Sequence, residues 1–157
     1  MKPKSLKERT RETMTELSLE VFRLNGALLA LGDDLVEDLG LTSARWQVLG
    51  AIAQSPVPLP VAHLARNMGL TRQSVQRLVG EMSTDGLLVL APNPHHRRAQ
   101  LVLFTERGKA AWDGSMSRWG PRAMVLGKEL PPESIEAAIE LLRSVRLRIE
   151  KDSASSG

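Results

Sequence analysis

The sequence predicts a mostly helical protein with one small β-hairpin. Apolar residues recur at helical spacing in several long segments, and only residues 87–104 contain two short β-compatible runs separated by turn residues. The central segment, residues 59–104, orders a short helix, a tight turn, a longer helix and then the hairpin. This order of elements is that of a winged helix-turn-helix.

A long helix is expected near the N-terminus, beginning between Ser5 and Thr13. Leucine and valine alternate spacings of four and three along it, and a second apolar stripe repeats every seven residues. Two apolar faces require two packing partners. Each glycine in a helix costs about 1 kcal/mol relative to alanine, so a helical hairpin turning near Gly26 is the alternative. The apolar pattern keeps its phase across Gly26 and Gly32, which favours one helix.

The next segment predicts a second helix followed by an extended connection. Gly40 is expected to end the first helix and Thr42 to cap the second. Three prolines in residues 55–60 exclude a helix there and favour an extended segment, with a minimal edge strand at 57–59. The buried stripe of the second helix is predicted to comprise Trp46, Leu49, Ile52 and Ala53.

The helix-turn-helix itself is predicted from residue 61 onward. Gly69 suits the positive-φ residue that ends the short helix, and Thr71 suits the cap of the longer one. The buried stripe of the short helix is Val61, Leu64, Ala65 and Met68. That of the longer helix is Val75, Leu78, Val79 and Met82.

The other face of the longer helix carries polar side chains that donate to phosphates or meet base edges in a major groove. These residues are Arg72, Gln73, Gln76, Arg77 and Ser83. On this stretch alone, an amphipathic helix pair with a solvated polar face remains an equal alternative.

The remaining elements are a wing and two C-terminal helices. Residues 87–91 and 100–104 are expected to pair as strands around a tip at residues 92–98. Thr105 is expected to cap a helix that breaks at Gly120-Pro121, and residues 130–133 to open the last helix. Residues 152–157 are predicted to form a loose tail.

Composition limits the classes of function. The 157 residues, 42% hydrophobic and 25% charged, suffice for one folded domain or a lobe with a helical extension. The absence of cysteine excludes disulfides, thiolate metal sites and thiol-based redox sensing. No secretion signal or membrane-spanning apolar run is present, so the cytoplasm is the expected location.

The net charge of +3 is unevenly distributed. Residues 45–109 contain eight Lys and Arg against three Asp and Glu, a net +5, whereas residues 1–44 carry −2 and residues 110–157 carry none. A basic helix-turn-helix segment favours binding to a polyanion. Aromatic residues make up only 3%, which disfavours stacking on single strands and makes duplex DNA the better target.

In these features the chain resembles the MarR (multiple antibiotic resistance regulator) family of transcription factors. The resemblance spans roughly residues 41–109. It rests on Leu41-Thr42, Trp46, Val48-Leu49, Leu64-Ala65, Leu70-Thr71, Val75, Arg77-Leu78-Val79, Asp85-Gly86-Leu87, Asn93-Pro94, Arg97-Arg98, Leu103, Thr105 and Gly108. It implies a homodimer in which residues 1–40 and 110–157 form a helical dimerisation base and residues 41–109 form the DNA-binding lobe.

The resemblance also implies roles for individual residues. The helix that follows Thr71 would enter the major groove, and Arg98 of the wing would enter the adjacent minor groove. The candidates for base edges are Arg72, Gln73 and Gln76. The candidates for phosphates are Thr71, Ser74, Arg77 and Arg97.

One position departs from the family pattern. The family wing typically has Asp two residues before the groove arginine, where this sequence has His96. A histidine that is mostly neutral at pH 7 cannot replace the ion pair that orients Arg98. Wing docking is therefore expected to be looser, or Arg97 and Arg98 exchange roles.

The leading hypothesis is a homodimeric regulator of a pseudo-palindromic operator, a repressor relieved by a small-molecule effector. The effector is implied by the resemblance alone, and core packing explains Trp46, Trp112 and Met116 better than a cavity does. The alternative is a winged-helix module that binds protein instead of DNA. No cofactor, metal or enzymatic activity is expected. His95 and His96 would point apart in a hairpin and have no Asp, Glu or Cys at ligand spacing, and His63 fits a phosphate contact or plain surface better than a catalytic base.

Overall fold

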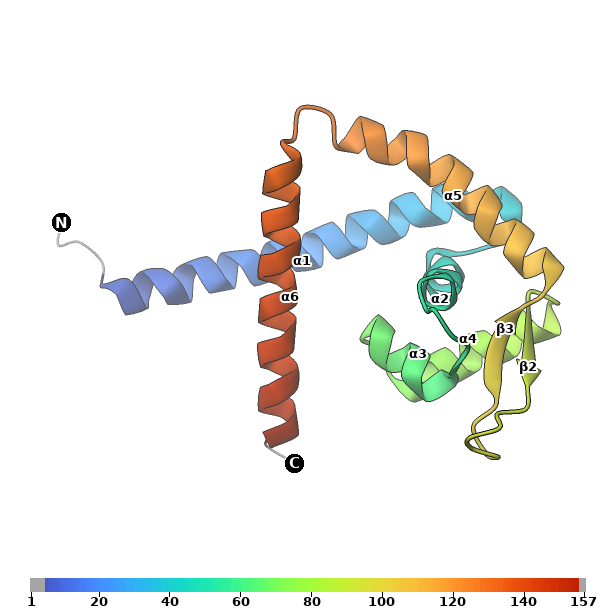
Figure 1. Cartoon of the computed structure of the whole chain (residues 1–157). Helices are drawn as coiled ribbons and strands as arrows, with labels where there is room; N and C mark the ends of the chain where they lie inside the picture. The colour runs from blue at the N-terminus through green and yellow to red at the C-terminus, as the bar shows by residue number, and fades with distance from the viewer. Residues whose placement is uncertain (1–4, 156–157) are drawn as a thin grey trace. The chain divides into compact units, whose positions relative to one another are not determined.

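The computed structural model describes residues 5–155. It contains two compact units, one up to Arg118 and the other from Trp119 onward. The elements, shown in Figure 1, are α1 (Leu6–Val36), η1 (Glu37–Leu39), α2 (Ser43–Ala53), β1 (Leu59–Pro60), α3 (Val61–Met68), α4 (Arg72–Thr84), β2 (Leu88–Ala91), β3 (Leu101–Phe104), α5 (Glu106–Leu126) and α6 (Pro132–Ser155). The predicted mostly helical, winged-helix fold is confirmed.

Helix α1 is one continuous helix, as predicted, and the alternative of a hairpin at Gly26 is wrong. It begins inside the expected interval because Ser5 caps it. The Ser5 backbone N–H donates to Glu8 Oε2 at 2.8 Å, and Glu8 N–H donates to Ser5 Oγ at 3.3 Å. The pKa of Glu8 is lowered from its ordinary value. The larger cause is the hydrogen bond that its carboxylate accepts from the Ser5 backbone N–H, and the smaller is the one that it accepts from the Ser5 hydroxyl.

The predicted boundaries of α2 are confirmed, but its buried stripe is partly wrong. Gly40 adopts a left-handed conformation with φ of 70° after η1, and the Thr42 side chain accepts from Arg45 N–H. Val48 and Leu49 are buried, whereas Ala53 is exposed. Ala53 is the last residue of α2, where the chain is already turning away from the core.

A close approach joins α1 to α2. Ser43 is buried, and its backbone N–H donates to Asp33 Oδ1 while its hydroxyl donates to Leu29 O, both at 2.6 Å. A Cβ at Gly32 would lie 2.2 Å from Ser43 Oγ. Gly32 therefore costs α1 some helical stability but allows this contact.

The helix-turn-helix follows the predicted pattern, with one correction. Gly69 has φ of 65°, and Thr71 Oγ1 accepts from Ser74 N–H. All four predicted apolar residues of α4 are buried. Ser83, however, does not lie on the exposed face: its hydroxyl is buried and makes no hydrogen bond within the described structure. It follows buried Val79 by one helical turn and so shares its face.

The predicted hairpin is confirmed and gains a third strand. β2 and β1 pair antiparallel with opposite edges of β3, with Leu88 opposite Phe104 and Leu59 opposite Val102. The edge strand lies at Leu59–Pro60 and not at 57–59, because the Val57 carbonyl instead accepts from Ser55 Oγ at 2.6 Å within a bend.

The core of the first unit lies between α2, α3, α4 and the sheet, which contact one another. The end of α1 and the start of α5 complete it. Its buried apolar residues are Val36, Leu41, Val48, Leu49, Val61, Leu64, Ala65, Val75, Leu78, Val79, Met82, Leu87, Leu88, Val102 and Ala111. This core buries one side of α4 and leaves its other side exposed.

Helix α5 begins beside the turn that connects α4 to β2. The Thr105 hydroxyl donates to Gly86 O at 2.7 Å and accepts from Gly108 N–H at 3.0 Å. The predicted break at Gly120-Pro121 is wrong, because α5 continues to Leu126. Proline fixes a φ that a helix can accept and removes one hydrogen bond, which the flanking turns of a long helix can tolerate.

The second unit contains the end of α5 and the whole of α6. Helix α6 extends to Ser155, so the predicted loose tail from residue 152 is wrong as far as the described residues go, and residues 156–157 lie outside them. The Ser153 and Ser155 hydroxyls donate to the carbonyls of Ile149 and Lys151, which prolongs the helix. In residues 5–155, no helix has the length and apolarity that crossing a membrane requires.

Substituting Gly108 with alanine is expected to destabilise the first unit by about 3 kcal/mol. A Cβ at this position would lie 1.9 Å from Leu87 O, a backbone atom that cannot turn aside. The free energy of unfolding in urea measures the effect. Gly80→Ala is the control, since nothing lies within 4 Å of a Cβ there. Equal stability of the two variants would contradict this account of the junction.

Candidate nucleic-acid interface

The exposed face of α4 gathers the polar residues that the sequence predicts for it. Arg72, Gln73, Ser74, Gln76 and Arg77 are all exposed. They occupy two successive turns at the start of the helix, opposite the buried stripe. The structure therefore brings all of these site candidates together on one surface.

The N-terminus of α4 adds backbone and hydroxyl donors to this surface. Thr71 Oγ1 accepts from Ser74 N–H at 3.2 Å and donates to Ser74 Oγ at 2.8 Å. This arrangement leaves the Ser74 hydroxyl proton for an external acceptor. The first turn of an α-helix also presents amides without helical partners and a positive dipole end, which favour an anion such as phosphate.

The wing tip owes its shape to Asn93, whose role the sequence analysis missed. Asn93 Oδ1 accepts from His95 N–H at 3.0 Å, and Asn93 Nδ2 donates to Ala99 O at 2.8 Å. These bonds close the loop from both sides. Asparagine before proline was the available signal, since its side chain readily bonds backbone two residues on.

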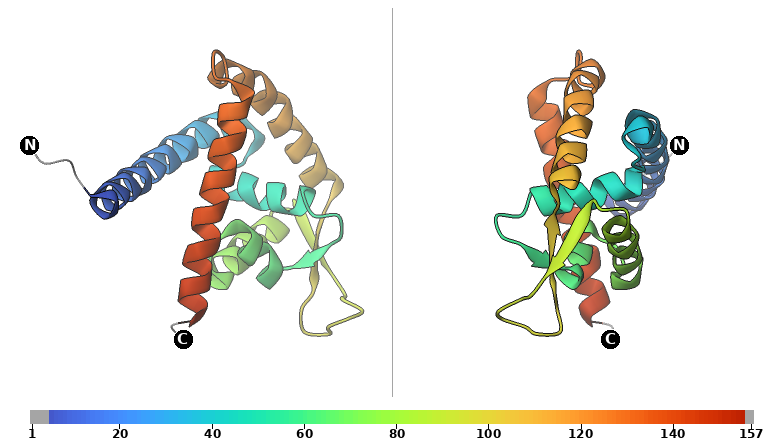
Figure 2. Two further views of the ribbon diagram at one scale, coloured as in Figure 1. Left: turned by 60° about the vertical axis from the view of Figure 1, so that its left-hand side comes forward. Right: turned by 90° about the vertical axis from the view of Figure 1, so that its right-hand side faces the viewer.

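The closed wing loop displays Arg97 and Arg98, which are both exposed. Figure 2 shows this loop projecting away from the helices of the lobe. Within residues 5–155, neither arginine forms an ion pair. His96 is also exposed, and its backbone, not its side chain, stabilises the turn by donating to Asn93 O and accepting from Ala99 N–H.

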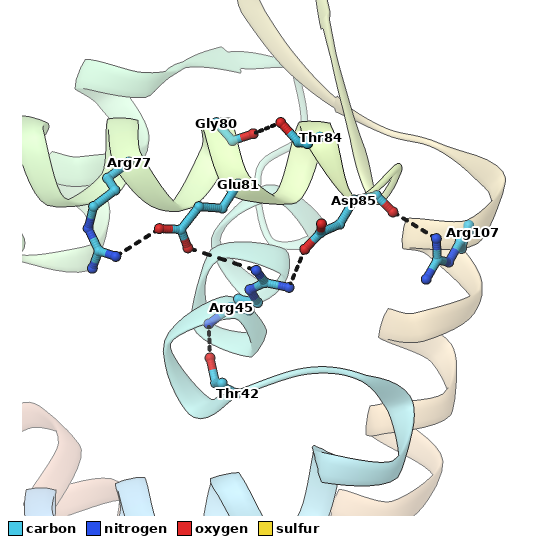
Figure 3. A network of polar contacts seen from close by, with 8 residues as sticks. All are labelled: Thr42, Arg45, Arg77, Gly80, Glu81, Thr84, Asp85 and Arg107. Atoms are coloured by element: carbon cyan, nitrogen blue, oxygen red, sulfur yellow. Dashed lines mark hydrogen bonds and ion pairs between the residues drawn. The ribbon is translucent and has the colours of Figure 1, made fainter.

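An ion-pair network behind this surface connects α2 to α4 (Figure 3). Arg45 of α2 places Nη1 2.8 Å from Asp85 Oδ2 and Nη2 3.8 Å from Glu81 Oε2. The Arg45 side chain is only 20% exposed. Sequence reasoning missed its role, because the two helices that it joins are separated by α3 along the chain.

The same network includes one of the predicted phosphate contacts. Arg77 Nη1 lies 2.8 Å from Glu81 Oε1, one helical turn further along α4. The i,i+4 spacing of this pair was visible in the sequence, although it was not used. Beyond the helix end, Arg107 of α5 donates to Asp85 O at 2.7 Å. The network thus joins the C-terminal half of α4 to α2 through Arg45 and to α5 through Arg107.

Two further groups of candidates are placed by the structure. Trp46 and Trp112 are partly buried against the core, and Met116 is exposed, so packing accounts for the two tryptophans. His63, His95 and His96 are exposed. No cluster of metal-ligating side chains occurs in the part of the chain that the structure describes.

Comparison with known proteins identifies the family. A family model described as MarR family matches residues 39–99. Uncharacterized proteins of Mycobacterium tuberculosis and Mycobacterium bovis are 33% identical over 132 residues, covering 84% of this chain and 88% of each relative. The transcriptional activatory protein BadR of Rhodopseudomonas palustris is 33% identical over 104 residues, covering 65% of this chain and 59% of BadR.

The chain belongs to the MarR family. It is therefore a DNA-binding transcriptional regulator and not an enzyme, as the sequence predicts. Solved MarR-type structures share its fold at low identity. The Mycobacterium tuberculosis regulator MosR in complex with DNA is 20% identical with a TM-score of 0.69, over 83% of this chain and 96% of MosR. CouR of Rhodococcus jostii bound to p-coumaroyl-CoA is 22% identical with a TM-score of 0.74, over 82% and 90%.

Replacing Arg45 with alanine is expected to lower the free energy of unfolding by about 1 to 2 kcal/mol. The substitution leaves Asp85 and Glu81 without the cation that joins α4 to α2. Urea denaturation followed by circular dichroism measures the loss. Arg45→Lys keeps the charge but not the fork of donors, so it should fall between the parent and Arg45→Ala. Parental stability of Arg45→Ala would show that the network is dispensable.

Proposed function

We propose that this MarR-family protein is a homodimeric regulator that binds a pseudo-palindromic operator in duplex DNA. The observation that supports it most directly is the exposed face of α4, which joins cationic and amide side chains to a helix N-terminus. Major-groove readers need donors of both kinds, for phosphates and for base edges. The protein would act in the cytoplasm, where it meets chromosomal DNA.

The side chains proposed to contact DNA fall into three groups by what they contact. Arg72, Gln73 and Gln76 contact base edges, where Gln suits adenine and Arg suits guanine. Phosphates are contacted by Thr71, Ser74, Arg77 and Arg97. Arg98 enters the minor groove from the wing. Arg98 forms no ion pair within residues 5–155, which supports this role because its guanidinium needs no release from those residues before it meets DNA.

The proposed dimer uses residues 1–40 and 110–157 as its base, with residues 41–109 as the DNA-binding lobe. Helix α1 leaves Phe22 72% exposed and Leu24 50% exposed, and α6 leaves Ile149 62% exposed. Large apolar side chains that a helix leaves exposed in this number mostly mark an interface. In a two-fold symmetric dimer, each α4 would meet one half-site, with the half-sites about one helical turn apart.

The proposed regulation is repression that a small-molecule effector relieves. CouR bound to p-coumaroyl-CoA supports the idea that this fold can hold such a ligand. An effector needs only a few kcal/mol of differential affinity to shift the spacing of the two α4 helices. The relative BadR bears the name of an activator, so repression is the part of this proposal that BadR does not support.

A winged-helix module that binds protein remains the second candidate. The observation that favours it is His96, which leaves the wing without the carboxylate of the family pattern. The exposed arginines beside it weigh against this candidate, since they favour a polyanion.

The Arg98→Ala variant is expected to bind operator DNA at least about tenfold more weakly, because a desolvated charge contact contributes about 1.5 to 3 kcal/mol. Selection of bound fragments from random DNA supplies the operator, and fluorescence anisotropy measures the affinity. The parent should lose affinity linearly with the logarithm of salt concentration. Equal affinity of variant and parent would refute the wing assignment, and a flat salt dependence would favour the protein-binding candidate.

A Phe22→Glu variant is expected to shift the dimer toward monomer, because it places a charge within the apolar surface of α1. Sedimentation velocity at micromolar concentration measures the change. Val57→Glu is the matched control, since Val57 is also an exposed apolar residue, at 59%, but lies in the lobe. A Phe22→Glu variant as dimeric as this control would exclude this face of α1 from the interface.

A further inference from the structure

Among the proposed DNA contacts, Arg77 alone has a guanidinium that forms an ion pair within the described residues 5–155. Its Nη1 lies 2.8 Å from Glu81 Oε1, whereas Arg97 and Arg98 form no ion pair in the described residues 5–155. Glu81 is also the only acidic residue within α4. A carboxylate therefore occupies one of the guanidinium nitrogens that a phosphate could contact.

We propose that Glu81 competes with DNA for Arg77, so that binding exchanges the Glu81 carboxylate for a backbone phosphate. This inference rests on the proposed role of Arg77 at the DNA. Glu81 makes no proposed DNA contact of its own. Its ion pair determines how readily the Arg77 guanidinium becomes available to a DNA phosphate.

The exposure of the pair makes the exchange feasible. The side chains of Arg77 and Glu81 are 69% and 41% exposed. An exposed i,i+4 ion pair shifts an equilibrium by about two- to fivefold only. A phosphate of duplex DNA can displace such a partner, because phosphate contacts also release counterions. The pair therefore lowers the affinity for DNA without preventing binding.

The rest of the network explains why the Glu81 carboxylate keeps a cationic partner when Arg77 moves away. Its second oxygen, Oε2, lies 3.8 Å from Arg45 Nη2. Arg45 is held in turn by Asp85 at 2.8 Å and is largely buried, so it stays in place when Arg77 moves (Figure 3). Departure of Arg77 consequently leaves no unpaired carboxylate. Arg45 is a positioning residue in this exchange, and Arg77 is the group that moves.

The test compares Glu81→Gln with a matched control. On α6, Arg146 Nη1 and Glu150 Oε1 form a pair with the same i,i+4 spacing and the same 2.8 Å distance. The Glu150→Gln variant thus removes an equal charge from a similar pair far along the chain from the proposed DNA contacts. Because α6 belongs to the proposed dimer base, sedimentation velocity first establishes that this variant is as dimeric as the parent. Affinity for one selected duplex is measured by anisotropy for both variants, for Arg77→Ala and for the double variant Arg77→Ala/Glu81→Gln.

We expect Glu81→Gln to bind about two- to fivefold more tightly than the parent, most clearly at low salt, where exposed charges are least screened. Glu150→Gln should match the parent, and adding Glu81→Gln to Arg77→Ala should give a distinctly smaller gain. Damage to the fold would weaken binding, so it cannot mimic this result.

Three outcomes would overturn the inference while leaving the proposed function intact. They are parental affinity of Glu81→Gln, an equal gain from Glu150→Gln, and an undiminished gain in the Arg77→Ala background. A parent protein that binds no duplex would overturn the proposed function together with the inference. The two failures are therefore distinguishable in one set of titrations.

Discussion

Burial of one side of α4 is the constraint on which the other features depend. Val75, Leu78, Val79 and Met82 fill the centre of the core, so the orientation of the helix about its own axis is determined by packing. The polar residues between them, such as Gln76 and Arg77, therefore face outward. The same packing withdraws Ser83 from that surface. The proposed DNA-binding face is thus a consequence of how the hydrophobic core is built.

The ion pairs and hydrogen bonds around α4 separate five arginines of the lobe by their partners. Arg45 and Arg107 bind Asp85 and hold the lobe together, whereas Arg97 and Arg98 remain open to solvent. Arg77 stands between the groups, paired but exposed. The net charge of +5 for residues 45–109 already subtracts the carboxylates of Glu81 and Asp85, so the positive excess comes from other cations, Arg97 and Arg98 among them.

The wing loop is closed by hydrogen bonds of Asn93, and these bonds do not orient its two arginines. Where the family pattern has a carboxylate, this chain has His96, and the loop is closed instead by the side chain and carbonyl of Asn93. Both wing arginines consequently lack an orienting partner within the described residues. The proposed minor-groove contact then depends on the position of the loop more than on the preset direction of one side chain.

The sequence by itself determined the helices, their caps, the hairpin and the family, because these depend on residues within one or two turns of each other. Thr42, Thr71 and Gly69 perform the local roles that their residue types predict. Only the tertiary structure decided the close contacts at Gly32 and Gly108 and the anchoring of α4 by Arg45. It also showed α5 passing through Pro121. Such features depend on which distant segments approach one another, and that is determined by the packing of the whole core.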